Sequence, residues 1–198
     1  MKGIIFTEEM FNAVIEGRKT QTRRIMQDGV PIGNWEETVK YARYKVGEVV
    51  YLKEKFRIGD FRLSSNGHYG ISYKDGTKKE TYFFYNEIDK IKKSQKSSMD
   101  GFASSYLMRE YFCRYYIEIT DVRVERLQDI SDEDCLKEGI FKREKWSLGT
   151  YYQYKWNGEV FQTAQEAYAA LINKTYGKGT WESNPYVWVY EFELVNNR

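Results

Sequence analysis

Aromatic side chains are frequent in this chain of 198 residues, and they limit the folds open to it. Tyr, Phe and Trp make up 17% of the residues, and only 2 prolines interrupt them. Tyr and Phe favour the half-buried, pleated surface of a β-sheet. Their rings can also stack on nucleic-acid bases, although packing in a core is the first explanation for any one of them. The composition therefore favours a fold built on strands.

Helix and strand signals follow one another along the chain. Capping residues before apolar stripes predict helices over 8–16, over 131–138 and from 163 onward. Strand-like alternation predicts strands over 17–24, where the residues are polar and basic, and over 45–56 and 114–127. A strand-turn-strand is predicted over 151–161, and a further strand over 184–194. The strand over 184–194 is apolar on both faces at its start and is predicted to be central, whereas the polar residues 26–44 are predicted to form a loop. This order predicts an α+β fold with a mixed, largely antiparallel β-barrel and flanking helices.

Residues 1–198 are predicted to form one domain with an insertion at 57–102. Within it, glycine-containing turns flank a short aromatic strand at Tyr69–Tyr73, which indicates a hairpin. Residues 90–98 are rich in lysine and are predicted to close the insertion as a basic loop.

The scarcity of histidine and cysteine removes several kinds of chemistry. The only histidine is His68, at the end of a turn rich in Ser, Asn and Gly, where an exposed loop residue is expected. The only cysteines are Cys113 and Cys135, without the spacing of a metal site, so no metal and no cofactor is predicted. Any reaction must therefore use Lys, Arg, Glu, Asp, Thr, Ser or Tyr.

The charge and apolar content indicate a cytoplasmic protein. Lys and Arg number 31 and Asp and Glu 29, so binding of nucleic acid would need a local basic patch. No apolar stretch approaches the ~20 residues of a membrane span. The apolar run at the N-terminus is too short for the apolar region of a signal peptide. Two unpaired cysteines suit a reducing compartment.

Three motifs, in order, carry a resemblance to a known family. They lie at Gly17–Arg24, Ile130–Ile140 and Trp181–Phe192. Together they resemble the ASCH domain family, a branch of the PUA-like superfamily, and in particular its bacterial and phage-type members. The resemblance covers residues 1–56 and 103–198 and leaves 57–102 outside it.

The resemblance implies a small PUA-like barrel with a cleft that faces RNA or a nucleoside. One small bacterial member of the family is an amidohydrolase that deacetylates N4-acetylcytidine with a Lys, a Thr and a Glu. Its motif matches Lys19 and Thr22 here, its glutamate matches Glu138, and Arg24 matches a further basic position. That enzyme is about half as long and has no counterpart of 57–102 or 141–162.

The residue chemistry assigns a role to each member of this trio. A threonine hydroxyl needs a neighbouring base to attack a carbonyl. A free lysine has a pKa of ~10.4, and a carboxylate beside Lys19 would hold it protonated. Glu138 is therefore expected to transfer the proton, Lys19 to stabilise the oxyanion, and Thr22 to attack or to orient water. Because strand alternation places Lys19 and Thr22 on opposite faces, a bend is required after Gly17.

Further residues are predicted to bind substrate or nucleic acid. A phosphate-binding patch is predicted from Arg18, Arg23, Arg24, Arg43, Lys45 and the lysines of 90–96. Trp181 and Tyr186 are candidates to stack on a base beside Asn184, whereas Trp188 is expected in the core. Solvated charges and an ordinary turn at Asn184 are the alternatives.

Three functions remain open at this point. The first is hydrolysis of an N-acyl amide on a modified nucleoside, with Lys19, Thr22 and Glu138 as the catalytic residues. The second is a non-catalytic module in which the same residues bind RNA. The third is metal-independent cleavage of RNA by Lys19 and Glu138.

Overall fold

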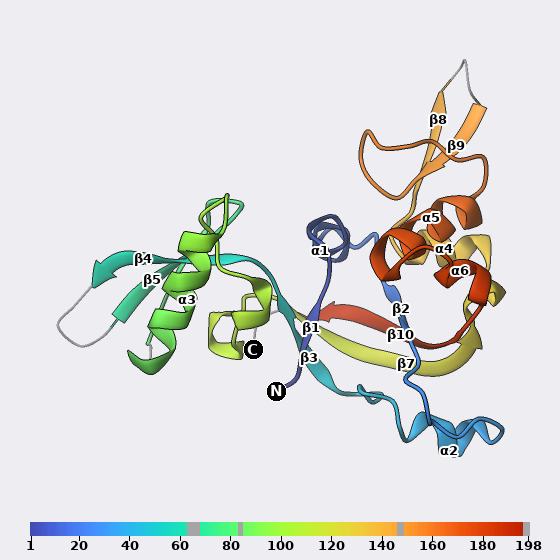
Figure 1. The fold of residues 1–198 in the computed structure, drawn as a ribbon, viewed down its shortest axis with the longest axis horizontal. Helices are drawn as coiled ribbons and strands as arrows, with labels where there is room; N and C mark the ends of the chain where they lie inside the picture. Colours follow the sequence, from blue (N-terminus) through green and yellow to red (C-terminus); the bar gives the residue numbers. More distant parts are fainter. Residues whose placement is uncertain (63–67, 83–84, 146–148, 196–198) are drawn as a thin grey trace. The chain divides into compact units, whose positions relative to one another are not determined.

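The computed structural model describes residues 1–62, 68–82, 85–145 and 149–195 (Figure 1). It confirms a mixed α+β fold with several sheets that are mostly antiparallel. The chain forms two compact units. The first contains Met1–Phe11, Val49–Tyr116 and the end of the chain from Val195, and the second contains Asn12–Glu48 and Ile117–Leu194. No described helix combines the length and the apolar character needed to cross a membrane.

The first unit contains a three-stranded sheet, a parallel pair of strands that belongs to a five-stranded sheet, and a helix. It contains β1 (Gly3–Ile5), β3 (Val49–Lys53), β4 (Phe56–Arg62), β5 (His68–Tyr73), β6 (Lys78–Tyr82), α3 (Tyr85–Ser97) and the 3₁₀ turns η1 (Ser105–Leu107) and η2 (Glu110–Phe112). Strand β1 pairs with β3 in parallel, and β4, β5 and β6 pair in that order, antiparallel. The hairpin predicted around residues 75 and 76 is thus confirmed as β5–β6.

Helix α3 replaces most of the predicted basic loop. Ile88 and Ile91, one turn apart, are buried in the core of the first unit with Ile58 of β4. Gln95 extends this contact, because its side chain accepts from the Ile58 backbone N–H at 3.2 Å and donates to the Ile58 carbonyl at 3.3 Å. The lysines of this segment therefore lie on a helix with an apolar face. His68 begins β5, and the predicted turn at 64–67 lies outside the described residues.

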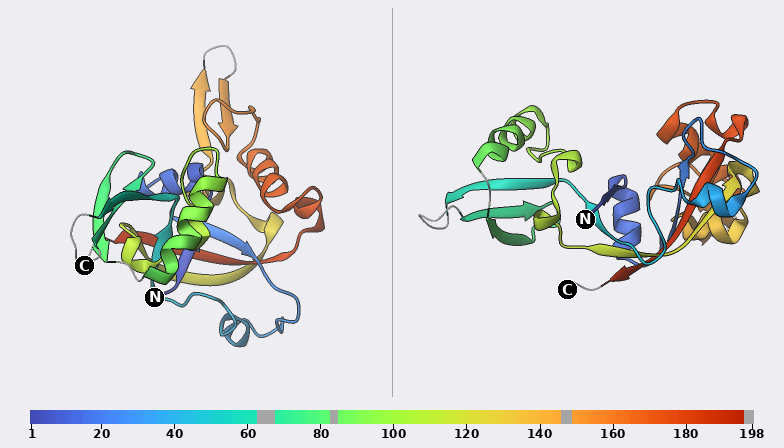
Figure 2. Two further views of the ribbon diagram at one scale, coloured as in Figure 1. Left: turned by 60° about the vertical axis from the view of Figure 1, so that its left-hand side comes forward. Right: turned by 90° about the horizontal axis from the view of Figure 1, so that it is seen from below.

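The second unit holds the remaining elements. They are β2 (Gln21–Ile25), α2 (Trp35–Val39), β7 (Tyr116–Arg126), η3 (Leu127–Asp129), α4 (Asp132–Lys137), β8 (Phe141–Lys145), β9 (Gly149–Gln153), α5 (Ala164–Tyr176), α6 (Thr180–Ser183) and β10 (Tyr186–Val195). Helix α1 (Glu8–Ile15) begins in the first unit and ends in the second. Strand β10 lies between β7 and β2, so the predicted central strand is confirmed. Strands β8 and β9 form an antiparallel ribbon that projects beyond α5 (Figure 2).

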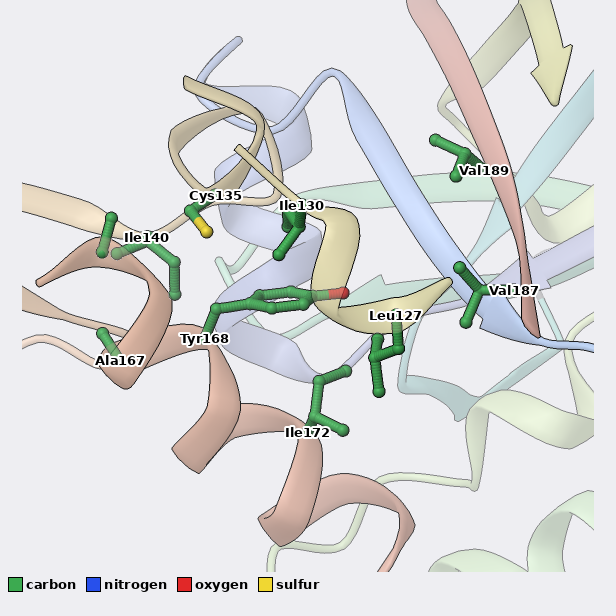
Figure 3. Packing of buried hydrophobic residues seen from close by; sticks show 10 residues of the cluster. Leu127, Ile130, Cys135, Ile140, Ala167, Tyr168, Ile172, Val187 and Val189 are labelled. Atoms are coloured by element: carbon green, nitrogen blue, oxygen red, sulfur yellow. The ribbon is translucent and has the colours of Figure 1, made fainter. Parts of the chain in front are cut away.

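Helices α4 and α5 cover an apolar core in the second unit (Figure 3). Tyr168 reaches from α5 toward Leu127 and Ile130, and Val187 and Val189 of β10 complete the cluster. A capping box at Thr163 begins α5: Glu166 N–H donates to the Thr163 hydroxyl, and the Glu166 carboxylate accepts from Thr163 N–H. The predicted helix from 163 onward is thus confirmed.

The predicted barrel is not found in the described residues of either unit. A sheet closes into a barrel only when its first and last strands pair. The five-stranded sheet has the order β1-β3-β7-β10-β2 and the three-stranded sheet the order β4-β5-β6, and within the described residues the end strands of neither sheet pair with each other. The strands are thus divided between separate sheets, and each sheet stays open.

Two local predictions were also wrong. The polar segment 26–44 contains helix α2, which Asn34 caps by accepting from the backbone N–H groups of Glu36 and Glu37 at 3.1 and 3.3 Å. The predicted strand-turn-strand over 151–161 is mainly β9 paired with β8, and only Tyr152 and Phe161 bridge across the turn.

Candidate functional site

The end of helix α1 directs Lys19 toward α4. Gly17 has a φ of +72°, which a glycine adopts without strain. Its N–H donates to the Val14 carbonyl, and the N–H groups of Arg18 and Lys19 both donate to the Ala13 carbonyl at 2.9 Å. This is the Schellman pattern of a helix C-terminus. The chain thus bends between Gly17 and the following strand, but this bend does not bring Thr22 to Lys19.

Lys19 and Glu138 form a buried ion pair in the second unit. The Lys19 ammonium donates to Glu138 Oε2 at 2.6 Å and to the Glu138 carbonyl oxygen at 2.8 Å. Their side chains are only 3% and 4% exposed. A backbone hydrogen bond of 2.9 Å from Thr20 N–H to the Lys137 carbonyl ties the two segments together beside the pair. The structure therefore brings together two of the three predicted catalytic residues.

Capping interactions at the two ends of helix α4 hold Glu138 in place. Ser131 caps α4 by accepting from Asp134 N–H at 3.1 Å, and Glu138 is the C-cap residue between Lys137 and Gly139, whose φ is +98°. Both ends of this short helix are thus fixed by the motif that the sequence pointed to. The carboxylate leaves the helix at a defined point and turns toward Lys19.

Arg23 lies at the centre of the carboxylates around this pair. Its Nη2 donates to Glu125 Oε2 at 2.7 Å and to Asp134 Oδ2 at 2.9 Å, and its Nη1 lies 3.4 Å from Glu138 Oε1. Nη1 also donates to the side-chain oxygen of Gln21. The guanidinium is fully buried, and its Nε has no hydrogen-bond partner among the described residues. Arg23 is thus committed to protein carboxylates rather than to a surface patch.

Burial dominates the electrostatics of Lys19. Loss of water around the ammonium lowers its pKa, and the charges of Arg24 and Arg23 lower it further. The charge and hydrogen bond of Glu138 act in the opposite direction but do not outweigh burial. The expectation that Glu138 would keep the pKa of Lys19 high is therefore wrong in direction. An amine in this position gives up its proton more readily than a free lysine does.

For Arg23 and Asp134 the neighbouring charges outweigh burial, so the pKa of each group shifts in the direction that favours its charged form. Burial disfavours the charged form of Arg23, yet Glu138, Asp134 and Glu125 outweigh it and raise the pKa of the guanidinium. Burial also disfavours charge on Asp134, but Arg23 outweighs it and lowers the pKa of that carboxyl. The raised pKa of Arg23 and the lowered pKa of Asp134 therefore keep the Arg23–Asp134 pair charged to lower pH than a free aspartate would allow.

Thr22 and Arg24 lie on the other face of β2. Arg23 is opposite Val189 of β10 and Thr22 is opposite Tyr190, and successive residues of a strand face opposite sides of the sheet. Thr22 is buried on the side where Tyr190 packs against Tyr44, with ring centroids 5.2 Å apart. Its hydroxyl makes no hydrogen bond to Lys19 or Glu138, which are both described. The structure thus pairs Arg23, rather than Thr22, with the Lys19–Glu138 pair.

The remaining predicted binding residues lie in different settings. Arg18 is half-exposed, donates to Glu16 Oε2 at 2.6 and 2.8 Å and stacks on Phe141. Trp181 packs against the second core, with its ring edge-on to Tyr168. None of these contacts of Arg18 and Trp181 involves Lys19 or Glu138.

Asn184 and Tyr186 belong to a separate arrangement near Arg126. Asn184 has a φ of +45°, and its side-chain oxygen accepts from Gln128 N–H at 2.8 Å, which confirms the turn. The Arg126 guanidinium lies 3.7 Å from the centroid of the Tyr186 ring, and Trp35 contacts the same ring at 5.9 Å. Trp188 is 6% exposed and lies in the core as expected.

Sequence reasoning missed the carboxylates that Arg23 gathers. A signal was available, because Gln21 and Arg23 share one face of β2 and α4 begins with three consecutive acids. Those acids were interpreted as helix capping alone. Glu125 lay in a clearly predicted strand, but its partner could not be inferred without the pairing of β7, β10 and β2.

The described residues offer no cluster for a metal ion. No three His, Cys, Asp or Glu side chains among them are grouped so that they could bind one. Cys113 and Cys135 are both free and buried, one in each unit. Burial raises the pKa of the Cys135 thiol to about 12 and that of Cys113 to about 11.

Comparison of the chain with protein-family models, with curated proteins and with solved structures gave no match. The resemblance to the ASCH domain family therefore stays a prediction from three motifs.

Proposed function

We propose that the chain is a PUA-like protein of the ASCH type that binds RNA or a modified nucleoside and hydrolyses an N-acyl amide, such as that of N4-acetylcytidine. One observation supports this most: Lys19 and Glu138, 119 residues apart, meet at 2.6 Å in a buried position. Two ionisable groups in contact, one with a shifted pKa, are typical of a site that moves protons.

The proposed reaction uses water as the nucleophile. Glu138 accepts a proton from water as its oxygen attacks the acyl carbon, and Lys19 stabilises the negative charge on the carbonyl oxygen. The C–N bond then breaks, the leaving nitrogen takes a proton, and the acid and the amine are released. The lowered pKa of Lys19 makes it able to supply that proton. Thr22 has no part in this version, because it lies on the other face of β2.

Incubation of the purified protein with N4-acetylcytidine tests this proposal, with release of cytidine followed by chromatography. We expect turnover by the wild type and a decrease in kcat/KM of about 100-fold or more in Lys19→Ala and Glu138→Gln. Glu133→Gln is the matched control, because Glu133 is an exposed carboxylate of the same helix. No turnover by the wild type, or turnover unaffected by Lys19→Ala, would overturn the proposal.

A non-catalytic RNA-binding module is the second candidate. The near-complete burial of Lys19 and Glu138, with each satisfying the other, favours it. Binding of RNA that weakens steeply with added salt, without formation of any product, would support this function instead.

A further inference from the structure

Arg18, Phe141, Trp156 and Arg143 form a continuous series of two rings flanked by two cations, here called the Arg–aromatic stack. The Arg18 guanidinium carbon lies 4.3 Å from the centroid of the Phe141 ring. The Phe141 and Trp156 centroids are 5.9 Å apart, and the rings meet edge to face at 71°. The Arg143 guanidinium carbon lies 3.7 Å from the Trp156 ring. Each contact is a cation–π or an aromatic pair, and here the three contacts join the four side chains into one series.

The local sequence explains how these four side chains meet. Phe141 and Arg143 are two residues apart in β8 and so share a face of the β8–β9 ribbon. Trp156 lies in a turn closed by a 3.0 Å hydrogen bond from Gly158 N–H to the Lys155 carbonyl. Asn157 occupies the left-handed position of that turn with a φ of +52°. The turn thus presents the indole ring beside β8.

The Arg–aromatic stack is open to an incoming ligand. Trp156 is 58% exposed although Arg143 covers part of its ring. Arg143 pairs with no carboxylate among the described residues, so its charge is available to an anion. Arg18 is bound to Glu16, and an anion there would compete with that carboxylate. The exposed Trp156 ring next to Arg143 suits a ligand that repeats a flat base and a phosphate.

The position of the stack links it to the site of the proposed function. Arg18 directly precedes Lys19, and Phe141 follows Glu138 by three residues. The stack therefore starts at the two segments that hold the Lys19–Glu138 pair and continues onto the β8–β9 ribbon and the turn after it. A strand of nucleotides that passes the pair would meet these rings next.

We propose that the Arg–aromatic stack binds single-stranded RNA beside the Lys19–Glu138 pair, which rests on the proposed function and makes an RNA, rather than a free nucleoside, its substrate. Bases next to the modified one stack on Trp156 and Phe141, and their phosphates contact Arg143 and Arg18. The segment 141–162 supplies three of the four residues, which gives a function to a part of the chain outside the three motifs.

Fluorescence anisotropy with the full chain and a labelled ten-nucleotide RNA carrying one N4-acetylcytidine tests this. We expect Trp156→Ala to raise Kd about tenfold, in the range of a lost base–aromatic contact, and Trp156→Phe to keep most of the affinity. Arg143→Gln is expected to reduce the slope of log Kd against log salt by about 0.7, the loss of one phosphate contact on a single strand. Tyr106→Ala and Lys178→Gln are matched controls, since both positions are exposed and outside the stack.

Release of acetate from the same RNA and from free N4-acetylcytidine separates the two proposals. Hydrolysis by the wild type together with unchanged RNA affinity in Trp156→Ala would overturn the Arg–aromatic stack as a binding surface and leave the enzyme. Loss of RNA affinity in Trp156→Ala without any hydrolysis would support the stack and overturn the enzyme. No binding of the RNA by the wild type would overturn the stack.

Discussion

Each of the two units contains an arginine bound by carboxylates, fully buried at Arg23 and partly buried at Arg114, and the two clusters differ in how well their groups are satisfied. The Arg23 cluster of the second unit consists of Lys19, Arg23, Glu125, Asp134 and Glu138. The Arg114 cluster of the first unit consists of Arg114, Glu54 and Asp75. Arg114 binds Glu54 through two hydrogen bonds of 2.7 and 2.8 Å, contacts Asp75 at 2.6 Å and lies 4.0 Å over the Tyr73 ring.

The Arg114 cluster has the geometry of a structural clamp. Two parallel hydrogen bonds to one carboxylate and a stacked ring satisfy most of the guanidinium. In the Arg23 cluster three carboxylates contact one buried arginine, Arg123 also contacts two of them, Glu125 and Asp134, and Lys19 contacts the third, Glu138. The Arg23 Nε has no partner among the described residues. The comparison indicates that a network in which several cations and carboxylates share partners, rather than a single ion pair, marks the candidate site.

The largest expected effect is the loss of Glu138. Glu138→Gln leaves the Lys19 ammonium and one arm of Arg23 buried without their carboxylate. Breaking a buried pair in this way costs about 3–5 kcal/mol in the free energy of unfolding, which urea titration measures. Glu37→Gln, at an exposed pair with Lys40, is the control and should stay within ~1 kcal/mol. A Glu138→Gln protein as stable as the wild type would show that the pair is not buried in solution.

A smaller loss is expected in the first unit. Glu54→Gln keeps hydrogen-bonding capacity toward Arg114, and the arginine retains Asp75 and the Tyr73 ring. We expect a decrease of about 1.5–3 kcal/mol in the free energy of unfolding, the range for hydrogen bonds to charged groups. If Glu54→Gln cost more than Glu138→Gln in the same titration, the ranking of the two clusters would be reversed.

Acid should change the two clusters in opposite directions. Arg23 holds the pKa of Asp134 below 3.8, so the unfolded chain takes up this proton first and the stability that Asp134 provides is lost as pH falls below 3.8. Burial outweighs Arg114 and raises the pKa of Glu54 above 4.5, so the folded chain takes up that proton first and gains stability as pH falls toward 4.5.

Urea titrations between pH 7 and pH 3 measure this difference. On acidification the difference in free energy of unfolding between the wild type and Asp134→Asn should become smaller. The difference between the wild type and Glu54→Gln should become larger. Gaps that move in the same direction in both variants would contradict the assignment.

The smallest expected effect compares the two cysteines. Burial raises the pKa of Cys135 to about 12 and that of Cys113 to about 11. At equal access, the thiolate of Cys135 would thus be about tenfold rarer at pH 8, and the thiolate is the reactive form. Reaction of Cys113→Ala and Cys135→Ala with a thiol reagent should be slower for the protein that retains Cys135. Equal or inverted rates would report easier opening of the second unit.

Much of the fold of the second unit follows from local signals. Helices α1, α4 and α5 were predicted because each has a capping residue, an apolar stripe or a terminating glycine in the sequence. Strands β7 and β10 were predicted from alternation and from a run that is apolar on both faces. These features depend on neighbours within a few residues, so the sequence alone carries them.

The errors concern pairing over long distances. The barrel was wrong because no local signal shows that the strands divide between separate open sheets. Helix α3 was hidden by its lysines, although Ile88 and Ile91 are spaced as on a helix face. The Lys19–Glu138 pair was predicted only through the three motifs, and Arg23 could join it only once β2 was aligned against β10.

The turn at Gly17 fixes the number of residues between helix α1 and Lys19. The Schellman turn uses one residue for the reversal and one for the return, and the ammonium comes next. Adding or removing a residue there would rotate Lys19 away from Glu138 without altering any side chain. Insertion of one alanine after Arg18 should therefore separate the Lys19 ammonium from Glu138 as completely as removal of the Glu138 carboxylate does.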